Sequence, residues 1–496
     1  MFLIFLFIFL SCSLYYVLLV IKNKRIRKML LQFPPIKGEI PLVGSTFRLL
    51  VKPEDSMNLI KELSYDIIDA GGVVRCHAMN YIYGIGLSDA DEITELLKTC
   101  LDKGYLYSFF KHFYGDVGVF GSASTAKARR QLQLPFFTPR VLNGFFDIFY
   151  KGSVRLSQKL EPLAGTGPFA ADQILGEWSF DTIIKTMGVS DNDNEVYSSK
   201  EFVEALKRSD DIIYNRIHSI WKHPDFMFKL TNNHYEANQM RKTIQKNSHK
   251  ILEVLQRTMK HDITSDENTD KYSKKNVLED LLRSGLSDEE ISQELVVLIL
   301  GTQLPSFALG YVLMLLGRYP SVQDRLNNEL EEILGAARPV SRDDLPKLVY
   351  LDMVIKESLR LFPPAPVIIR RVLKDIMLPS GRVVPAGVEA MVSILGLHRD
   401  PKYWGPDAEH FDPDRFAPDR IRSVPANAYI PFSSGPRNCI GYRYGLMAMK
   451  VALCTVLRKY RIVGEPAPGP APDIRTKYEL FMKPLDDFTI QIDNKQ

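Results

Sequence analysis

The side chains best suited to chemistry lie in one ten-residue segment, residues 432–441, which reads FSSGPRNCIG. A thiolate that binds iron needs a loop whose backbone amides point at the sulfur and restrain its charge, and glycines allow that close approach. An arginine two residues before the cysteine can neutralise a carboxylate of a porphyrin. The segment therefore predicts a haem-binding loop with Cys439 as the metal ligand. Its candidate residues are Phe432, Gly435, Arg437, Cys439 and Gly441.

The alternative interpretation of this segment is a buried structural cysteine in a turn, because that is what most lone cysteines are. From average residue frequencies, these five residues should occur by chance in one ten-residue window in on the order of one in ten thousand chains of this length. We therefore favour the functional interpretation over the structural one.

The segment resembles the haem-binding loop of the cytochrome P450 superfamily, with Cys439 as the proximal ligand. Two further motifs follow that family in order and spacing. Glu357 and Arg360, in KESLRLFPPAP, are similar to its E-x-x-R helix. FDPDRF at 411–416 is similar to the segment whose arginine, here Arg415, completes that ion-pair set. By spacing alone the first two residues would form a modest surface pair, whereas the resemblance implies a buried structural network.

The resemblance covers nearly the whole chain beyond the amino-terminal segment. It implies a mainly α fold with a small β region, and a haem b cofactor that is non-covalent apart from the Cys439 thiolate bond. The run Val-Ile-Ile at 367–369 resembles the strand that crosses over the haem, where it would present an apolar wall to a substrate. Core packing explains that run almost as well.

Haem propionates need cations, and the resemblance implies three of them. Arg437 lies in the loop, and Arg370 follows the Pro-rich end of the E-x-x-R helix. Arg130 falls where the family places a basic residue upstream of a Pro-x-Phe. The family often has Trp and His where this chain has Ala126 and Arg129, so Arg129 is an alternative to Arg130. A solvated basic face would also explain this arginine pair.

The helix that faces the haem in this family carries the motif A-G-x-D/E-T-T, and the chain departs from it. The aligned residues, 300–305, read Leu-Gly-Thr-Gln-Leu-Pro, so the acid and the alcohol that organise waters for proton delivery are both missing. Gln303 can hold water but cannot supply a proton of matched pKa. Thr302 and Ser306 are the alternative hydroxyl sources. Pro305 has no amide hydrogen and should bend the helix open beside the iron.

The motif spacing is most similar to the microsomal type, the group that contains fatty-acid ω-hydroxylases and many insect enzymes. Many of those ω-hydroxylases carry a glutamate that forms an ester with the haem at the position of Leu300. We therefore expect no covalent bond between this chain and the haem apart from the Cys439 thiolate bond. The absence of that glutamate also weakens the hypothesis that the enzyme hydroxylates a terminal methyl group.

The resemblance implies a haem-thiolate monooxygenase that inserts one oxygen atom from O2 into a small hydrophobic substrate such as a lipid, a hydrocarbon or a xenobiotic. Its implied electron donors are NADPH-cytochrome P450 reductase and, as a second partner, cytochrome b5. The missing acid and alcohol leave two alternatives open. One is a haem-thiolate isomerase or dehydratase that needs no reductase, and the other is a non-catalytic haem-binding protein.

The elements that position these residues begin with an amino-terminal run, 2–21, that contains no charged side chain. About 20 apolar residues are enough to cross a bilayer as a helix. Five basic residues follow at 22–28, and such a cluster stays on the cytoplasmic side. A cleaved signal peptide is less consistent, because the run is long and shows no small-x-small cleavage site. We predict a transmembrane signal anchor over 1–21, in the endoplasmic reticulum membrane, with a single pass and a cytosolic catalytic domain.

Beyond the anchor we predict a basic and Pro-rich lead-in at 22–48, then one haem-thiolate catalytic domain at 49–496. Strand patterns occur at 73–87 and after Pro466, and the polar tract 261–276 predicts an exposed loop. Ser287 and Glu290 have the spacing of a capping box before an apolar stretch. That stretch, 291–316, predicts a buried core helix in preference to a second membrane span, because it contains polar residues and a proline.

Composition is consistent with a folded, membrane-associated enzyme. The 496 residues are 45% hydrophobic and 25% charged, which excludes disordered and fibrous classes. A net charge of +4 is too small to suggest nucleic acid as a partner. The five cysteines are far apart and odd in number, which favours reduced thiols over a disulfide framework or a zinc site.

Overall fold

A computed structural model describes residues 2–40, 43–49, 51–78, 82–189, 200–265, 277–335, 338–467 and 469–495. The chain forms two compact units, each built from segments that are far apart in the sequence. Unit 1 comprises Met1–Tyr105, Ala365–Ala408 and Val424–Asn438, and unit 2 comprises Leu106–Pro364, Glu409–Ser423 and Cys439–Gln496. The predicted catalytic domain is thus divided between two units. No linker marks the division, because the chain passes from one to the other several times.

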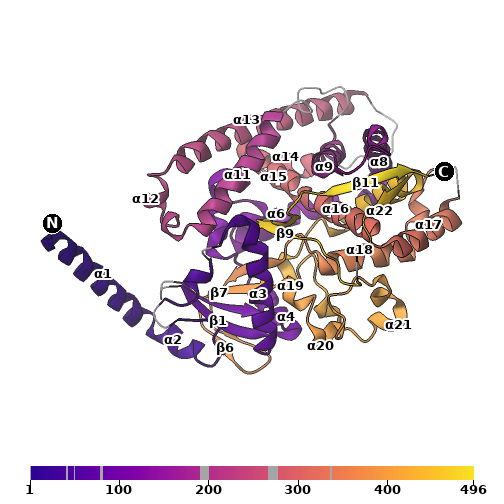
Figure 1. Ribbon diagram of the computed structural model, residues 1–496. Coiled ribbons are helices and arrows are strands. Elements are labelled where there is room, and N and C mark those ends of the chain that lie inside the picture. The colour runs from indigo at the N-terminus through magenta and orange to yellow at the C-terminus, as the bar shows by residue number, and fades with distance from the viewer. Residues whose placement is uncertain are drawn as a thin grey trace. The chain divides into compact units, whose positions relative to one another are not determined.

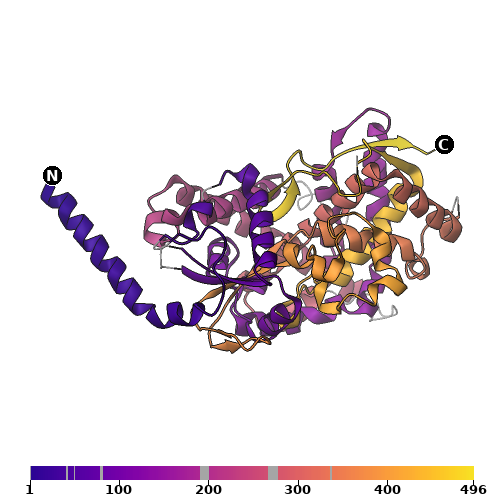
Figure 2. The same ribbon diagram turned by 60° about the horizontal axis from the view of Figure 1, so that its bottom comes forward.

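Unit 1 contains a four-stranded sheet in the order β1-β2-β7-β4 and a two-stranded sheet of β5 and β6 (Figures 1 and 2). Strand β2 pairs antiparallel with β1 and parallel with β7, and β7 pairs antiparallel with β4. The strands are β1 Val73–Ala78, β2 Ile82–Leu87, β4 Val367–Arg371, β5 Ile376–Met377, β6 Val383–Val384 and β7 Glu389–Ser393. The helices are α1 Phe2–Lys22, α2 Lys24–Leu30, α3 Ser56–Asp69, α4 Ala90–Thr99, α19 Ile394–Leu397 and α20 Pro401–Trp404.

The core of unit 1 joins the central strands to helix α4. Ile85 of β2, Val392 of β7 and Leu96 of α4 are each 0% exposed and belong to one hydrophobic cluster. Asp89 caps α4 by accepting hydrogen bonds from two backbone N–H groups of its first turn, which fixes where that helix begins. The predicted hairpin at 73–87 is therefore confirmed, and its strands form one edge of the main sheet.

Unit 2 is mainly helical, with a three-stranded sheet in the order β3-β11-β8 and a hairpin of β9 and β10. Its strands are β3 Phe169–Ala170, β8 Tyr460–Val463, β9 Thr476–Glu479, β10 Phe481–Pro484 and β11 Thr489–Asn494. Its helices from α5 to α12 are α5 Ser108–Tyr114, α6 Ala123–Gln133, α7 Pro139–Gly144, α8 Phe146–Leu160, α9 Asp172–Met187, α11 Lys200–His218 and α12 Asp225–Phe228. The remaining helices are α13 Asn232–Ser265, α14 Val277–Leu282, α15 Asp288–Gly301, α16 Gln303–Arg318, α17 Pro320–Leu334, α18 Val349–Leu361, α21 Pro418–Ile421 and α22 Tyr442–Lys459.

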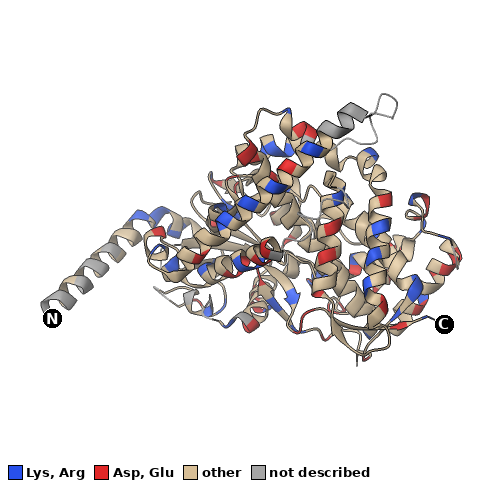
Figure 3. Cartoon of the chain, turned by 90° about the horizontal axis from the view of Figure 1, so that it is seen from above, with Lys and Arg blue, Asp and Glu red and all other residues tan. Residues whose placement is uncertain are grey.

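Charged residues of both signs are interspersed along the helices (Figure 3). The predicted mainly α fold with a small β region is confirmed. Strands after Pro466 are confirmed as β9, β10 and β11. The predicted loop at 261–276 is wrong in its first part, because α13 continues to Ser265; the rest of that tract lies outside the described residues.

Helix α1 covers 21 residues, about 31 Å at 1.5 Å per residue, and its helical conformation agrees with the predicted anchor. Membrane insertion of this segment stays a prediction. Among the described residues, the one helical stretch found long and apolar enough to cross a membrane is Asp288–Arg318, and 67% of its most apolar window is buried. Burial within unit 2 supports its predicted role as a core helix. Ser287 and Glu290 form the predicted capping box at its start.

A buried ion-pair network anchors α18 to the segment that follows it in unit 2. Glu357 and Arg360 are each 0% exposed, and two hydrogen bonds of 2.7 and 2.8 Å join the guanidinium to the carboxylate. Arg360 also donates to the carbonyl of His410, and Glu357 accepts from the N–H of Asp412. The Arg415 guanidinium lies 3.5 Å from the Glu357 carboxylate. The buried network implied by the resemblance is therefore present, and the surface pair expected from spacing alone is wrong.

Replacing Glu357 with alanine should destabilise the protein by about 3–5 kcal/mol, because it leaves the Arg360 and Arg415 guanidinium groups without their carboxylate. Thermal unfolding of the haem-loaded protein measures the effect. Lys356→Ala is the matched control on the same helix, since its pair with Asp352 is partly exposed and should contribute less than about 1 kcal/mol. Equal losses in the two variants would contradict the structural role of the network.

Candidate functional site

The predicted haem-binding loop passes from unit 1 to unit 2 between Asn438 and Cys439. On the unit 1 side a short 3-10 turn spans Gly435–Arg437 and lies against α4. Gly435 has φ +72°, and a Cβ placed there would lie 2.6 Å from the Leu97 carbonyl oxygen. Only glycine combines this left-handed conformation with so close a backbone approach. This fixes the shape of the loop where Arg437 enters it.

On the unit 2 side Cys439 lies two residues before Gly441, the N-cap of α22. The Gly441 N–H donates a hydrogen bond to the cysteine sulfur, so one loop amide points at the sulfur as the sequence predicts. Burial raises the pKa of the Cys439 thiol, whereas the Gly441 N–H and the charge of Arg130 lower it. The residue is nevertheless exposed. The exposed sulfur is therefore accessible to a ligand.

Cys439 is more exposed than the other cysteines whose side chains are described. Cys100 and Cys454 are buried, and burial raises the pKa of their thiols to about 11 and about 12. Partly buried Cys76 also has its thiol pKa raised to about 12. These four cysteines are free. Cys439 alone among them combines exposure with a nearby arginine, which is the environment of a reactive thiol or a metal ligand.

Three cationic side chains gather in unit 1. Arg370, on β4, is 0% exposed, and Lys103 forms a backbone bridge with it. Burial lowers the pKa of Lys103 well below its usual value, and the charges of Arg370 and Arg437 lower it further. Like charges repel one another in a buried site, so such a group of cations suits a ligand with carboxylates. The two haem propionates fit this donor set.

Arg370 and Arg437, both predicted from the sequence, thus share a neighbour, Lys103, that the sequence did not reveal. Lys103 carries no local signal, because it is a single lysine in an irregular stretch. Only the pairing of its segment with β4 places it beside the two arginines.

The two candidate arginines of α6 in unit 2 have different surroundings. Arg130 interacts electrostatically with Cys439. Arg129 instead forms ion pairs with Glu290 and, at 3.4 Å, with Glu294, both on α15. The geometry therefore favours Arg130 over Arg129 as the cation near the sulfur.

Glu294 was missed by sequence reasoning. It is 0% exposed, and burial raises the pKa of its carboxyl to about 7. Its two oxygens accept hydrogen bonds from the Gly118 N–H at 3.2 Å and from the Gln133 side chain at 2.8 Å. Because Gln133 and Arg129 both lie on α6, Glu294 holds that helix, and with it Arg130, against α15.

The apolar core helix is interrupted at Thr302, between α15 and α16. The Thr302 N–H bonds to the carbonyl of Ile299 at 3.0 Å, a tighter turn than that of an α-helix. Pro305 follows one turn later and cannot donate to the carbonyl of Gly301. The predicted opening of the helix is therefore present. Gly301 is exposed, and no atom lies within 4 Å of a Cβ placed on it.

One face of this helix is open and apolar. The partly exposed residues of this helix recur at helical spacing on the side of Gly301. Helix α16 also packs against α22, the helix that follows Cys439. Pro305 lies next to Gly445 of α22, 3.3 Å from a Cβ placed there. The residues of the open face are Val297, Leu300, Gly301, Leu304 and Pro305.

The candidate hydroxyls do not lie on that open face. Thr302 and Ser306 are 6% and 3% exposed, and at about 100° per residue they fall on the opposite side of the helix. The Thr302 hydroxyl donates to the carbonyl of Ile299 at 2.6 Å, and the Ser306 hydroxyl donates to the carbonyl of Gln303 at 2.7 Å. Both protons are thus used within the helix. Gln303 is partly exposed.

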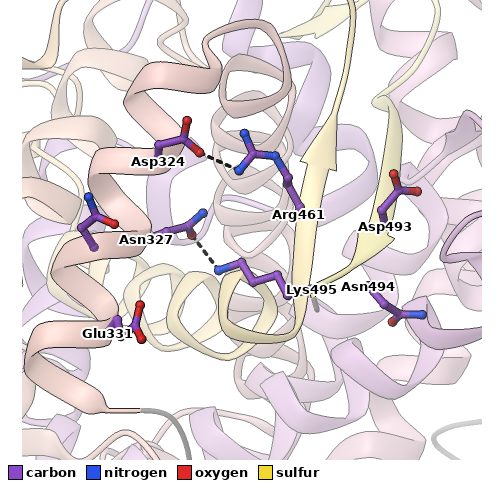
Figure 4. Close-up of a pocket in the computed structure, with 8 residues that line it drawn as sticks. Asp324, Asn327, Glu331, Arg461, Asp493, Asn494 and Lys495 are labelled. Atoms are coloured by element: carbon purple, nitrogen blue, oxygen red, sulfur yellow. Dashed lines mark hydrogen bonds and ion pairs between the residues drawn. The ribbon is translucent and has the colours of Figure 1, made fainter.

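A separate pocket of about 560 Å³ lies between α17 and the strands β8 and β11 (Figure 4). All eight residues that line it are polar or charged. Arg461 pairs with Asp324 at 2.6 Å across it, and Lys495 donates to Asn327 at 2.9 Å. These surroundings do not suit a small hydrophobic substrate.

Comparison with known proteins identifies the family of this chain. A sequence model of the family described as cytochrome P450 matches residues 34–489. The chain belongs to the cytochrome P450 family. Its relatives include cytochrome P450 4c21 of Blattella germanica, which is 32% identical over 450 residues and covers 88% of each chain. Cytochrome P450 4F2 of Homo sapiens is 31% identical over 395 residues and covers 76% of each chain.

These similarities confirm the predicted membership of the cytochrome P450 superfamily. As a cytochrome P450 the protein is an oxidoreductase of the monooxygenase class, and its family binds haem b through a cysteine thiolate. The enzyme class and the haem b cofactor expected from the sequence are therefore confirmed.

Proposed function

We propose that this P450 binds haem b iron through Cys439 and inserts one oxygen atom from O2 into a small hydrophobic substrate, such as a lipid, a hydrocarbon or a xenobiotic. The observation that carries the proposal is the environment of the Cys439 sulfur. The sulfur accepts a hydrogen bond from the Gly441 N–H, lies near Arg130 and is exposed to a ligand. When bound, the haem supplies the iron at which O2 is activated.

The remaining predicted residues would hold the cofactor. Arg370, Arg437 and Arg130 would bind or neutralise the propionates, and we add Lys103 to this set. Gly435 and Gly441 shape the loop, and Phe432 would pack beside the sulfur. The open face formed by Val297, Leu300 and Leu304 would present an apolar surface to the substrate.

Electrons would come from NADPH through NADPH-cytochrome P450 reductase, with cytochrome b5 as a second donor. Two observations support a docking surface near the cysteine. Arg443 is an exposed cation in the first turn of α22, and Arg140 is exposed on α7, which packs against α22. Exposed cations steer an acidic partner toward a surface and accelerate its association.

A monooxygenase with this distal helix lacks the usual groups for delivering protons to the iron-bound oxygen. The acid and alcohol positions of the family motif hold Gln303 and Leu304, and the nearby hydroxyls of Thr302 and Ser306 donate to backbone carbonyls. This arrangement also favours a second candidate function, an isomerase or dehydratase that rearranges its substrate without a reductase. Such a reaction needs neither electrons from NADPH nor a proton relay from solvent.

A double change, Gln303→Asp with Leu304→Thr, should raise the amount of product formed per NADPH oxidised. Losing a positioned proton donor costs about 10²- to 10⁴-fold in the step that it serves, so the natural protein should consume NADPH with little product. The measurement compares NADPH consumption with product in both proteins, with Gln303→Asn as the control that restores neither group.

Two results would contradict this account. Tight coupling in the natural protein that falls in the double variant would remove the argument about proton delivery. Conversion of a peroxide substrate without any NADPH consumption would replace the monooxygenase by the rearrangement enzyme.

We further propose that α1 anchors the protein in the endoplasmic reticulum membrane with the catalytic domain in the cytosol. The support is the uncharged run 2–21, the helical conformation of Phe2–Lys22 and the basic cluster that follows it. In sealed microsomes, added protease should digest the catalytic domain, and it should do so without detergent. Protection of that domain until detergent is added would reverse the orientation.

A further inference from the structure

The distal helix, formed by α15 and α16, is held at its interruption by a side chain from another helix of unit 2. The hydroxyl of Ser179, on α9, donates a hydrogen bond of 2.5 Å to the carbonyl of Thr302, the residue between α15 and α16. The two residues are 5% and 6% exposed. The bond therefore lies away from water, where a hydrogen bond is electrostatically stronger.

This bond completes the contacts of the Thr302 polar groups. The Thr302 N–H bonds to the carbonyl of Ile299 at 3.0 Å, and the Thr302 hydroxyl donates to that same carbonyl at 2.6 Å. Those two contacts lie within the distal helix and move with it. The bond from Ser179 instead connects the interruption to a different helix.

Pro305 permits the distal helix to bend but does not by itself select one angle. A proline at this position cannot donate to the carbonyl of Gly301, so the backbone loses a bond that normally joins successive turns. On one side Pro305 lies beside Gly445 of α22, 3.3 Å from a Cβ placed there. A contact from another direction is needed to fix the angle, and Ser179 supplies it from α9.

Helix α9 is itself held in place around Ser179. It packs against α8 and α16. Trp178 and Thr182, on either side of Ser179, are 4% and 1% exposed. Gly152 of α8 lies so close to Thr182 that a Cβ placed on the glycine would be 3.0 Å from the threonine hydroxyl oxygen. The Ser179 hydroxyl therefore reaches the distal helix from a fixed position.

The open side of the interruption lies opposite to this contact. Thr302 is buried where it meets α9, whereas Gly301 is exposed and no atom lies within 4 Å of a Cβ placed on it. The space beside Gly301 depends on the angle at which α15 meets α16. A bond that fixes this angle from the buried side therefore also sets the space on the open side.

We propose that Ser179 is a positioning residue of this P450, which holds the Thr302 carbonyl and thereby keeps the open face of the distal helix in one conformation. Ser179 acts only through the helix and not on a reacting atom. This inference rests on the proposed function, because it assigns a residue to the same site.

Loss of the hydroxyl in Ser179→Ala should make the interruption mobile. Hydrogen exchange of the haem-loaded protein, followed by mass spectrometry, measures this separately for residues 299–306 and 308–316. We expect exchange in residues 299–306 to become about 3- to 10-fold faster, as loss of one hydrogen bond implies, and exchange in 308–316 to stay unchanged. Ser179→Thr keeps a hydroxyl and should restore the slow exchange.

Ser153→Ala is the matched control for these variants. Ser153 is 0% exposed on α8, and its hydroxyl donates to the carbonyl of Phe149 in its own helix at 2.7 Å. It should lower the thermal unfolding temperature about as much as Ser179→Ala and leave exchange in residues 299–306 unchanged. Equal acceleration in both variants would overturn the inference, because it would reflect a general loss of stability.

The infrared band of carbon monoxide bound to the reduced haem gives a second readout. Its frequency depends on the groups around the bound molecule, so several conformations of the distal helix give a broad or split band. Ser153→Ala should keep the band width of the natural protein, whereas Ser179→Ala should broaden or split the band. A band in Ser179→Ala as narrow as that of the natural protein would contradict the positioning role.

A combination with Pro305→Ala tests whether Ser179 acts on the interruption itself. This change restores an N–H that can bond to the Gly301 carbonyl, so the helix no longer depends on α9 at this point. In that background Ser179→Ala should accelerate exchange in residues 299–306 by less than about twofold. The same acceleration in both backgrounds would mean that the two sites act independently, and would place the effect of Ser179 in the packing of α9.

Failure of the proposed function would appear separately from failure of this inference. A protein that oxidises no substrate with NADPH would not be a monooxygenase. The assignment of Ser179 would still be tested in that case, because neither hydrogen exchange nor the infrared band requires turnover.

Discussion

The arrangement of this protein depends on keeping negative charge on one sulfur atom inside a folded chain. Burial opposes ionisation of Cys439, and the Gly441 N–H and Arg130 offset only part of that effect, since the thiol pKa remains raised. A metal cation on the sulfur would complete the compensation. Contacts far from Cys439 in the sequence help to compensate the charge on its sulfur. Glu294 holds α6, and so Arg130, against α15, and the glycine at position 435 brings the loop against α4.

Charge compensation also explains where the chain departs from the family that it belongs to. Where the family often has a histidine, Arg129 pairs with acids of α15, so it is not the cation near the sulfur. The distal helix carries Gln303 and Leu304 in place of the acid and the alcohol. The residues that differ from the family pattern therefore bear on proton delivery, while the loop around the cysteine keeps that pattern.

Local sequence signals predicted the features that depend on neighbouring residues. The capping box of Ser287 and Glu290, the hairpin at 73–87 and the break before Pro305 each follow from residues within one or two turns of each other. The motif around Cys439 is similarly local. The short strands β3, β5 and β6 were not predicted, because two residues carry no periodicity. β3 forms only by pairing with the distant strand β11, and β5 and β6 form only by pairing with each other.

Residues whose roles arise from tertiary contacts could not be found in the sequence. Lys103 and Glu294 are single charged residues outside any motif, and only burial beside distant groups shifts their pKa values. The hydroxyls of Thr302 and Ser306 were plausible by spacing, but the helix turns them away from its open face. The division of the chain into two compact units was also hidden, since each unit is assembled from separated segments.

The carbon monoxide spectrum of the reduced protein tests the central claim most directly, because a thiolate ligand shifts the haem band strongly to longer wavelength. The account predicts that band in the natural protein, its loss in Cys439→Ala, and its retention in Cys454→Ala, which changes a buried cysteine of the adjoining helix α22. An unchanged band in Cys439→Ala would assign the iron to another residue and would contradict the account.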